Sequence, residues 1–206
     1  MTTHSVLDRH LIEPGRLVTL IDGVFAVAMT LLVLDLKLPS ENGELASSLR
    51  QMLPGFLVYL IVFASIAGYW IIHHSYFRYL TYVDIRLVVL SLINLLFVTL
   101  CPLMASIVSA HPLEPLATIC LSTNSLLYCL SAWAIWSYAA AHCRLLAEEV
   151  DPGALQHEAR IMLFVAISLA IAIPLAYLNV TLTYAIWILC APTASLWVMR
   201  KRVSRI

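Results

Sequence analysis

The segment LVVLSLINLLFVTLCPLMASIVSA, residues 87–110, carries no charged side chain. A helix that crosses the hydrocarbon core of a bilayer needs about 20 predominantly apolar residues. The run is continuous and does not alternate between apolar and polar residues, which favours a helix over a strand of a membrane barrel. We therefore expect residues 87–110 to form a transmembrane helix.

Comparable apolar runs lie on both sides of this segment. The longest covers residues 161–199, which carry no charge and are too many for one ordinary span, so we expect a turn near 179–183 to divide them. The sequence thus predicts an all-α integral membrane protein, a single domain over residues 1–206. Its six expected spans are approximately residues 17–37, 54–75, 87–110, 115–141, 160–178 and 182–200.

The composition excludes a soluble globular domain, because 62% of the residues are hydrophobic and only 12% are charged. Twelve basic and twelve acidic residues cancel, so the chain has no overall basic field and we expect no nucleic-acid partner. The five cysteines lie in or beside apolar stretches without metal-ligand spacing, which is typical of small core residues. The first sixteen residues lack the apolar core of a cleavable signal peptide.

Six spans place both chain ends on one side of the membrane, and the basic residues indicate which side. Ten Lys and Arg residues fall on the side of the termini and two on the other. Because basic residues concentrate in cytoplasmic loops, we expect a multi-pass protein of the cell (inner) membrane with both termini in the cytoplasm. The ten are Arg9, Arg16, Arg78, Arg86, Arg144, Arg160, Arg200, Lys201, Arg202 and Arg205, and the two are Lys37 and Arg50.

Asp22 interrupts the first apolar run. An unpaired carboxylate within a span costs about 2.5–3.5 kcal/mol on insertion scales, so Asp22 needs a partner or water. At helical spacing it lies off the face shared by Gly23, Val27, Thr30, Leu31 and Leu34. We expect Asp22 to brace neighbouring helices; direct contact with an ion or proton remains an alternative.

Further polar residues gather at the end of the second span and in the third. His73 and His74 follow Trp70, and adjacent helical residues point about 100° apart, so the pair is poorly placed to bind one metal ion. A hydrogen-bonding role is favoured, with a titrating switch and a heme or metal ligand as alternatives. Asp84 suits the N-terminus of the third helix, and Asn94 predicts an interhelical hydrogen bond.

The motifs of common enzymes are absent. The chain has no G-x-S-x-G, H-E-x-x-H, P-loop or G-x-G-x-x-G pattern, and no apolar span holds a pair of carboxylates. The potassium-filter sequence T-V-G-Y-G is missing as well. We expect neither an enzyme nor a bound cofactor or metal, and a channel would need another kind of constriction.

Residues 16–34, RLVTLIDGVFAVAMTLLVL, resemble the first-helix signature R-x-x-x-F-S-D-G-V-F-A-I-A-x-T-L-L of the transmembrane protein 175 family. This family comprises the lysosomal potassium channel and its bacterial relatives. A second match follows at the expected distance, with Trp70, His73, His74, Phe77, Asp84, Asn94-Leu95-Leu96-Phe97 and Pro102. Together the two matches cover about the first half of the chain.

The resemblance implies a six-helix subunit, four of which surround a pore lined by the first helix. The family's constriction is hydrophobic, and the positions that match it here are Val27, Leu31 and Leu34, with Thr30 beside them. The residues expected to form a structural network behind the pore are Arg16, Asp22, Trp70, His73, His74, Asp84 and Asn94. Two departures stand out: Leu20-Ile21 replaces the family's Phe-Ser, and Val27 replaces a larger Ile, which predicts a wider ring.

The resemblance therefore implies a homotetrameric, passive cation channel in the lipid bilayer that favours potassium over other monovalent cations. One rival is a proton pathway or proton-coupled transporter that uses Asp22 and His73 or His74 as a relay. A second rival is a heme- or metal-binding membrane protein with one of these histidines as ligand.

Overall fold

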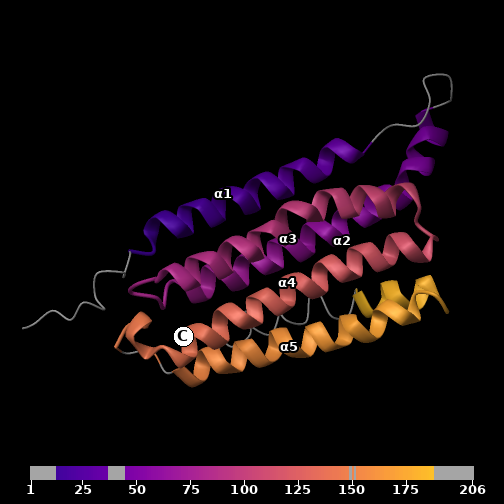
Figure 1. The fold of residues 1–206 in the computed structure, drawn as a ribbon. Coiled ribbons are helices and arrows are strands. Elements are labelled where there is room, and N and C mark those ends of the chain that lie inside the picture. Colours follow the sequence, from indigo (N-terminus) through magenta and orange to yellow (C-terminus); the bar gives the residue numbers. More distant parts are fainter. Residues whose placement is uncertain (1–12, 37–44, 149, 151, 188–206) are drawn as a thin grey trace, which may run out of the picture.

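The computed structural model describes residues 13–36, 45–148, 150 and 152–187, and long helices dominate them. The elements are α1 (Gly15–Leu31), continued by the 3-10 turn η2 (Leu32–Asp35), α2 (Leu45–Phe77), α3 (Ile85–Ala110), α4 (Pro115–Ala141), η3 (Cys143–Leu145) and α5 (Pro152–Leu175). Residues 180–187 are helical too. Figure 1 shows the five long helices running side by side along a common direction.

Each of the five long helices is long and apolar enough to cross a membrane. For the described residues, the prediction of an all-helical chain with several helices of membrane-crossing length is thus confirmed. The expected sixth span, 182–200, lies mostly outside the described residues, although its first residues continue a helix that begins at 180.

Two helices begin well before the spans expected from hydropathy. α2 begins at Leu45, although polar residues up to 51 suggested a loop and the span was expected from 54. α5 begins at Pro152, although the expected span starts at 160. Proline is favoured in the first helical turn, where its missing N–H has no partner to lose. Hydropathy detects the apolar part of a helix, whereas backbone hydrogen bonds continue into polar residues that face water.

The polar break between α5 and the next helix lies slightly earlier than the expected 179–183. α5 ends at Leu175, and residues 176–178 form the turn. The Asn179 side chain accepts a hydrogen bond from the Leu182 backbone N–H at 3.0 Å. Such a bond satisfies one of the free N–H groups at a helix start.

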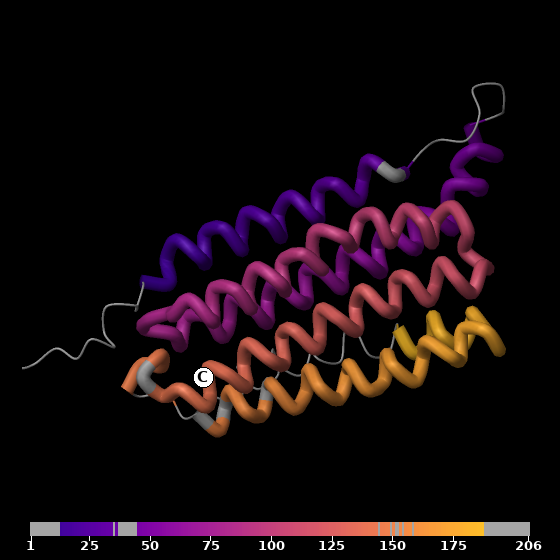
Figure 2. Tube along the Cα trace, in the orientation of Figure 1, coloured from indigo at the N-terminus to yellow at the C-terminus, as the bar shows by residue number. Residues whose placement is uncertain are grey.

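The helices are ordered so that α1 lies at one edge of the bundle and α5 at the other. α1 packs on α2 and α3, α3 packs on α4, and α4 packs on α5. Figure 2 follows the same order from the indigo helix α1 to the orange helix α5. The core between them is fully buried at Phe25, Phe77, Tyr128 and Trp136. Among the described residues α1 has partners on one side only, so none of them covers its other side.

At the end of the bundle where α1 begins, two loops are tied together. The Thr81 N–H donates to the Leu145 carbonyl at 2.9 Å, and the Ala147 N–H donates to the Tyr79 carbonyl at 3.0 Å. Leu80 and Leu146 form an isolated antiparallel bridge. The turn between α2 and α3 and the loop between α4 and α5 therefore form one cap.

Candidate functional site

The α1 helix has a buried face and an exposed face. Its buried side chains recur every three or four residues, as expected for one side of a helix; they are Leu17, Ile21, Phe25 and Ala28. On the exposed side, the exposed fractions of Val27, Leu31 and Leu34 are 55%, 43% and 69%, respectively. Gly23 and Thr30 are exposed as well. The face singled out in the sequence is therefore the one that no other part of the described subunit covers.

A shallow, mostly apolar groove runs along this face where α1 meets α3. It has a volume of about 390 Å³, and Gly23, Val27 and Leu31 line it together with Thr99 of α3. The Thr30 hydroxyl donates to the Val27 carbonyl at 2.8 Å. That bond fixes the hydroxyl proton on the helix backbone and leaves the oxygen lone pairs as the outward polar feature.

Asp22 connects α1 to α2. The indole Nε1–H of Trp70 donates to Oδ1 of the half-buried Asp22 at 2.8 Å. The imidazole of His74 stacks on the Trp70 ring at a centroid distance of 5.2 Å. Asp22, Trp70 and His74 thus form one contact chain beside α1, and the carboxylate has the partner that its position in an apolar span requires.

His73 lies in a different environment from its neighbour. Its ring stacks on Phe77 at 4.1 Å and lies 5.7 Å from Trp136 and 6.0 Å from Phe25, measured between centroids. The side chain is buried, and its Nε2 has no hydrogen-bond partner among the residues that the structure describes. His73 is part of an aromatic cluster between α1, α2 and α4, whereas His74 is exposed. Among the described residues, no group of three potential metal ligands comes together.

Asp84 joins the start of α3 to the end of α4. Its Oδ1 accepts from the Leu87 backbone N–H at 2.9 Å and so caps the helix. Its Oδ2 accepts from the Tyr138 hydroxyl at 2.6 Å. Tyr138 was not predicted from the sequence, because 54 residues separate it from Asp84 and no local pattern marks the pairing.

Asn94 lies in the middle of the bundle, between α3 and α4. Its Nδ2 donates to the Tyr128 carbonyl at 3.1 Å and to the Ser131 hydroxyl at 2.8 Å. In return, Nδ2 of Asn124 on α4 donates to the Phe97 carbonyl on α3 at 3.0 Å. Sequence reasoning identified Asn94 but missed Asn124, although both are amides within apolar runs and the same signal could have found it.

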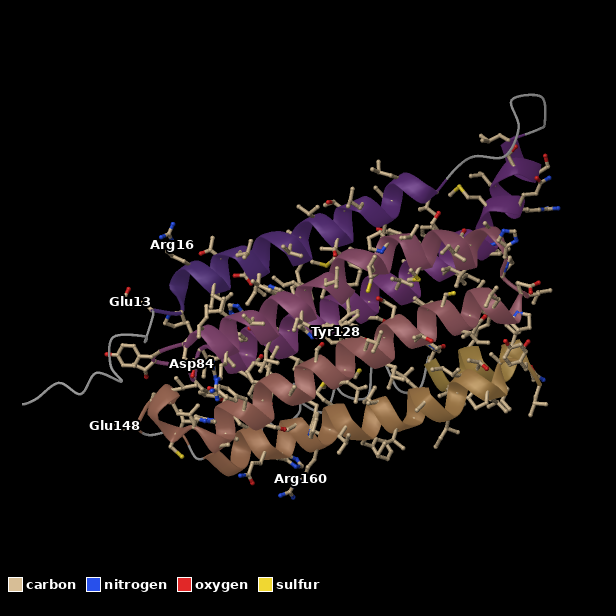
Figure 3. All side chains as sticks on the ribbon, in the orientation of Figure 1. Glu13, Arg16, Asp84, Tyr128, Glu148 and Arg160 are labelled. Carbon is tan, nitrogen blue, oxygen red and sulfur yellow. The ribbon has the colours of Figure 1, made fainter. Side chains whose placement is uncertain are left out.

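Arg16 stands apart from these contacts. Its side chain is exposed and makes no hydrogen bond or ion pair with the other described residues of the subunit. Figure 3 shows it extending from the start of α1 away from α2 and α3, far from Asp84 on the inner side. The expected network is therefore split in the structure, with Asp22, Trp70 and His74 in contact and Asp84, Asn94 and Arg16 elsewhere.

Comparisons with known proteins agree with this architecture. Residues 16–102 match the family described as endosomal/lysosomal potassium channel TMEM175. A potassium channel of Chamaesiphon minutus is 34% identical over 146 residues, which is 68% of this chain and 72% of that protein. A potassium channel of Streptomyces collinus is 31% identical over 180 residues, 84% of this chain and 87% of that protein.

A solved structure is similar as well. The crystal structure of a lysosomal potassium-selective channel TMEM175 homolog from Chamaesiphon minutus superposes with a TM-score of 0.78. It is 27% identical in sequence and covers 88% of this chain and 96% of its own. The match extends the likeness beyond the first half of the chain to nearly the whole subunit. These relatives are ion channels and not enzymes, and with its apolar helices the chain is a membrane protein that belongs to the TMEM175 family.

Proposed function

We propose that the chain is a passive cation channel that favours potassium, formed by four copies around a pore lined by α1. The observation that carries the proposal is the uncovered face of α1, with Val27, Leu31 and Leu34 exposed. One helix cannot enclose a path for ions, so the function requires several copies around a closed symmetry axis. The names of the similar bacterial proteins support potassium as the favoured ion.

Val27, Leu31 and Leu34 recur at helical spacing along that face, so four copies would stack three apolar rings along the axis. Apolar rings strip water from an ion and can close the path by dewetting. They offer no oxygen atom to replace that water. Selectivity would therefore depend on the hydration cost of each ion and on the outward lone pairs of Thr30, whose proton is held by the Val27 carbonyl.

The polar contacts beside the rings have a bracing role in this proposal. Asp22 and Trp70 fix α1 against α2, with His74 stacked on the indole. Asp84 and Asn94 hold α3 to α4, and His73 packs in the aromatic core. Arg16 is exposed in the first turn of α1, and its membership of this network stays a prediction.

The proposal also covers the placement of the protein in the inner membrane. Six spans per subunit would put both termini in the cytoplasm. Arg16, Arg78 and Arg86 support this orientation, since they flank the ends of helices at the same end of the bundle. Arg50 lies in the first turns of α2, at the opposite end, and Lys37 lies outside the described residues.

Ion flux from proteoliposomes that contain the purified protein tests the function. Potassium, sodium and a large impermeant cation are compared under a set gradient, with a proton ionophore present so that charge build-up does not limit flux. We expect potassium flux above sodium flux and none for the large cation. Equal release of all three cations would indicate an unspecific leak and contradict the proposal.

A parallel run without the ionophore separates the channel from the proton pathway. Protein that moves no metal cation but acidifies or alkalinises the vesicle lumen under a pH gradient would favour the relay through Asp22 and the histidines. Both runs use the same vesicles. Unfolded protein would move neither metal cations nor protons, so it cannot imitate either result.

A further inference from the structure

The first turns of α2 extend past the rest of the bundle. A Cβ on Gly55 would lie 2.7 Å from the Ser109 hydroxyl oxygen, so α2 and α3 are in close contact at this level. α3 ends one residue later, at Ala110. The part of α2 that precedes Gly55 therefore lies beyond the end of its neighbour.

This part of α2 is not needed to cross the bilayer. Residues 55–77 alone give a length of roughly 35 Å at about 1.5 Å per residue, more than the hydrocarbon core of about 30 Å. Figure 1 shows the first turns of α2 standing at an angle to the rest of the helix. Pro54 explains the change of direction, because proline removes a backbone hydrogen bond and clashes with the preceding turn.

The projecting turns are amphipathic. Leu45, Leu49 and Leu53 are spaced four residues apart and share one face. Their exposed fractions are 69%, 49% and 54%, respectively. Ser47 and Gln51 lie on the opposite face, and Arg50 lies on the flank between the two. A row of exposed leucines outside the membrane-crossing part of a helix marks a contact surface.

We propose that residues 45–53 rest on the surface of the lipid bilayer, with the three leucines at the boundary of the acyl chains and Arg50 on a phospholipid phosphate. The leucine row continues along the same face of α2 into Phe56, Leu60 and Phe63, which are exposed on the membrane-crossing part. The lipid-facing surface therefore runs without interruption from the span onto the projecting turns.

The position of Arg50 fits the same partner. A basic side chain on the flank of an amphipathic helix can extend its charge to the headgroups while its methylene groups stay on apolar surface. Attraction between Arg and anionic lipid adds to the burial of the leucines. The inference rests on the membrane location of the chain and holds whether or not α1 lines a pore.

Photocrosslinking of the full-length protein in vesicles of phosphatidylglycerol and phosphatidylethanolamine tests the inference. Benzoylphenylalanine replaces Leu49 or, in a second variant, Leu53, and covalent products are identified by intact mass. The matched control carries the probe at Gln51 on the polar face, and a reference variant carries it at Phe63. We expect phospholipid adducts at positions 49, 53 and 63, with several-fold less at position 51.

Two results would overturn the inference. Protein dimers crosslinked through positions 49 and 53, without lipid adducts, would show that a second copy covers the leucines. Adducts at position 63 but none at 49 or 53 would show that the projecting turns stay in water. Two probe positions on the leucine face guard against a single variant that fails to fold.

Discussion

At the scale of single residues, the exposure of a side chain in a membrane protein does not show whether it faces lipid or a pore. Contact between an apolar side chain and lipid is not unfavourable. The exposure of Val27, Leu31 and Leu34 therefore shows only that the described part of their own subunit does not cover them. The distinction between a lipid-facing and a pore-facing stripe depends on what a change in side-chain size does to ion flow. Val27 offers the sharpest comparison, since it occupies the position where the family has a larger residue.

We expect Val27→Ala to widen the constriction and to raise potassium flux or lower the preference for potassium over sodium. A ring of smaller side chains leaves a wider opening, which admits a hydrated ion more easily and dewets less readily. The matched control is Val33→Ala, the same chemical change at a residue that is 51% exposed and points about 100° away. Flux from proteoliposomes measures both variants. Equal effects at the two positions would contradict the assignment of the pore face.

We expect Trp70→Phe to loosen the contact between α1 and α2. The substitution keeps an aromatic ring but removes the donor to Asp22, which leaves a half-buried carboxylate without this partner and costs on the order of 1–3 kcal/mol. Thermal unfolding in detergent should show a lower Tm than for Trp133→Phe, which alters a tryptophan on α4 that is 38% exposed. A role of Asp22 in proton transfer alone predicts an unchanged Tm instead.

Single residues also show where sequence reasoning succeeds and where it stops. Asp22 and Asn94 were detectable because a polar group inside an apolar run is costly and needs a partner. The partners of such polar residues were not all detectable. Tyr138 pairs with Asp84 and Ser131 with Asn94, and in each pair the long separation along the sequence gives no signal. The separation of His73 from His74 likewise depends on which face of α2 meets Trp136.

At the scale of helices, apolar runs indicate where each membrane helix lies but not where it begins. The start of α2 at Leu45 was hidden by Ser47, Ser48 and Arg50, which are compatible with a helix that leaves the bilayer. The start of α5 was hidden by the charged residues Glu158 and Arg160, of which Arg160 is exposed. What joins neighbouring helices is equally invisible to hydropathy, because it depends on close approach at small residues such as Gly55.

We expect Gly55→Ala to destabilise the packing of α2 on α3. Alanine normally stabilises a helix interior by roughly 0.5–1 kcal/mol over glycine. Here its Cβ would lie 2.7 Å from the Ser109 oxygen, so the serine must rotate or the helices must separate. Gly15→Ala is the control, because nothing lies within 4 Å of the added atom.

The second substitution Ser109→Ala should restore the stability lost in Gly55→Ala, because it removes the contacting oxygen. Thermal unfolding of the two single variants and the double variant measures the coupling. A Tm for Gly55→Ala at or above the original value would show that the two helices are not held together by this contact.

At the scale of the whole molecule, the orientation in the membrane follows from which end of the bundle collects the basic residues. Arg16 lies in the first turn of α1, Arg78 follows α2, and Arg86 lies in the first turn of α3, so all three lie at the end capped by the tied loops. The cap also contains Cys143, which is exposed, whereas Cys101 and Cys129 are buried. Labelling of the Cys143 thiol can therefore report on which side of the membrane this end of the bundle lies.

We expect a membrane-impermeant maleimide to label Cys143 in inside-out membrane vesicles and not in intact spheroplasts. The orientation with both termini in the cytoplasm places the cap on the cytoplasmic side, where an external reagent cannot reach it. Cys143→Ser identifies the labelled site, since the difference between the two proteins isolates this one thiol from the other four cysteines. Labelling in intact spheroplasts that disappears in Cys143→Ser would place the cap outside the cell. The leucine-bearing turns of α2, at the other end of the bundle, would then rest on the inner leaflet instead of the outer one.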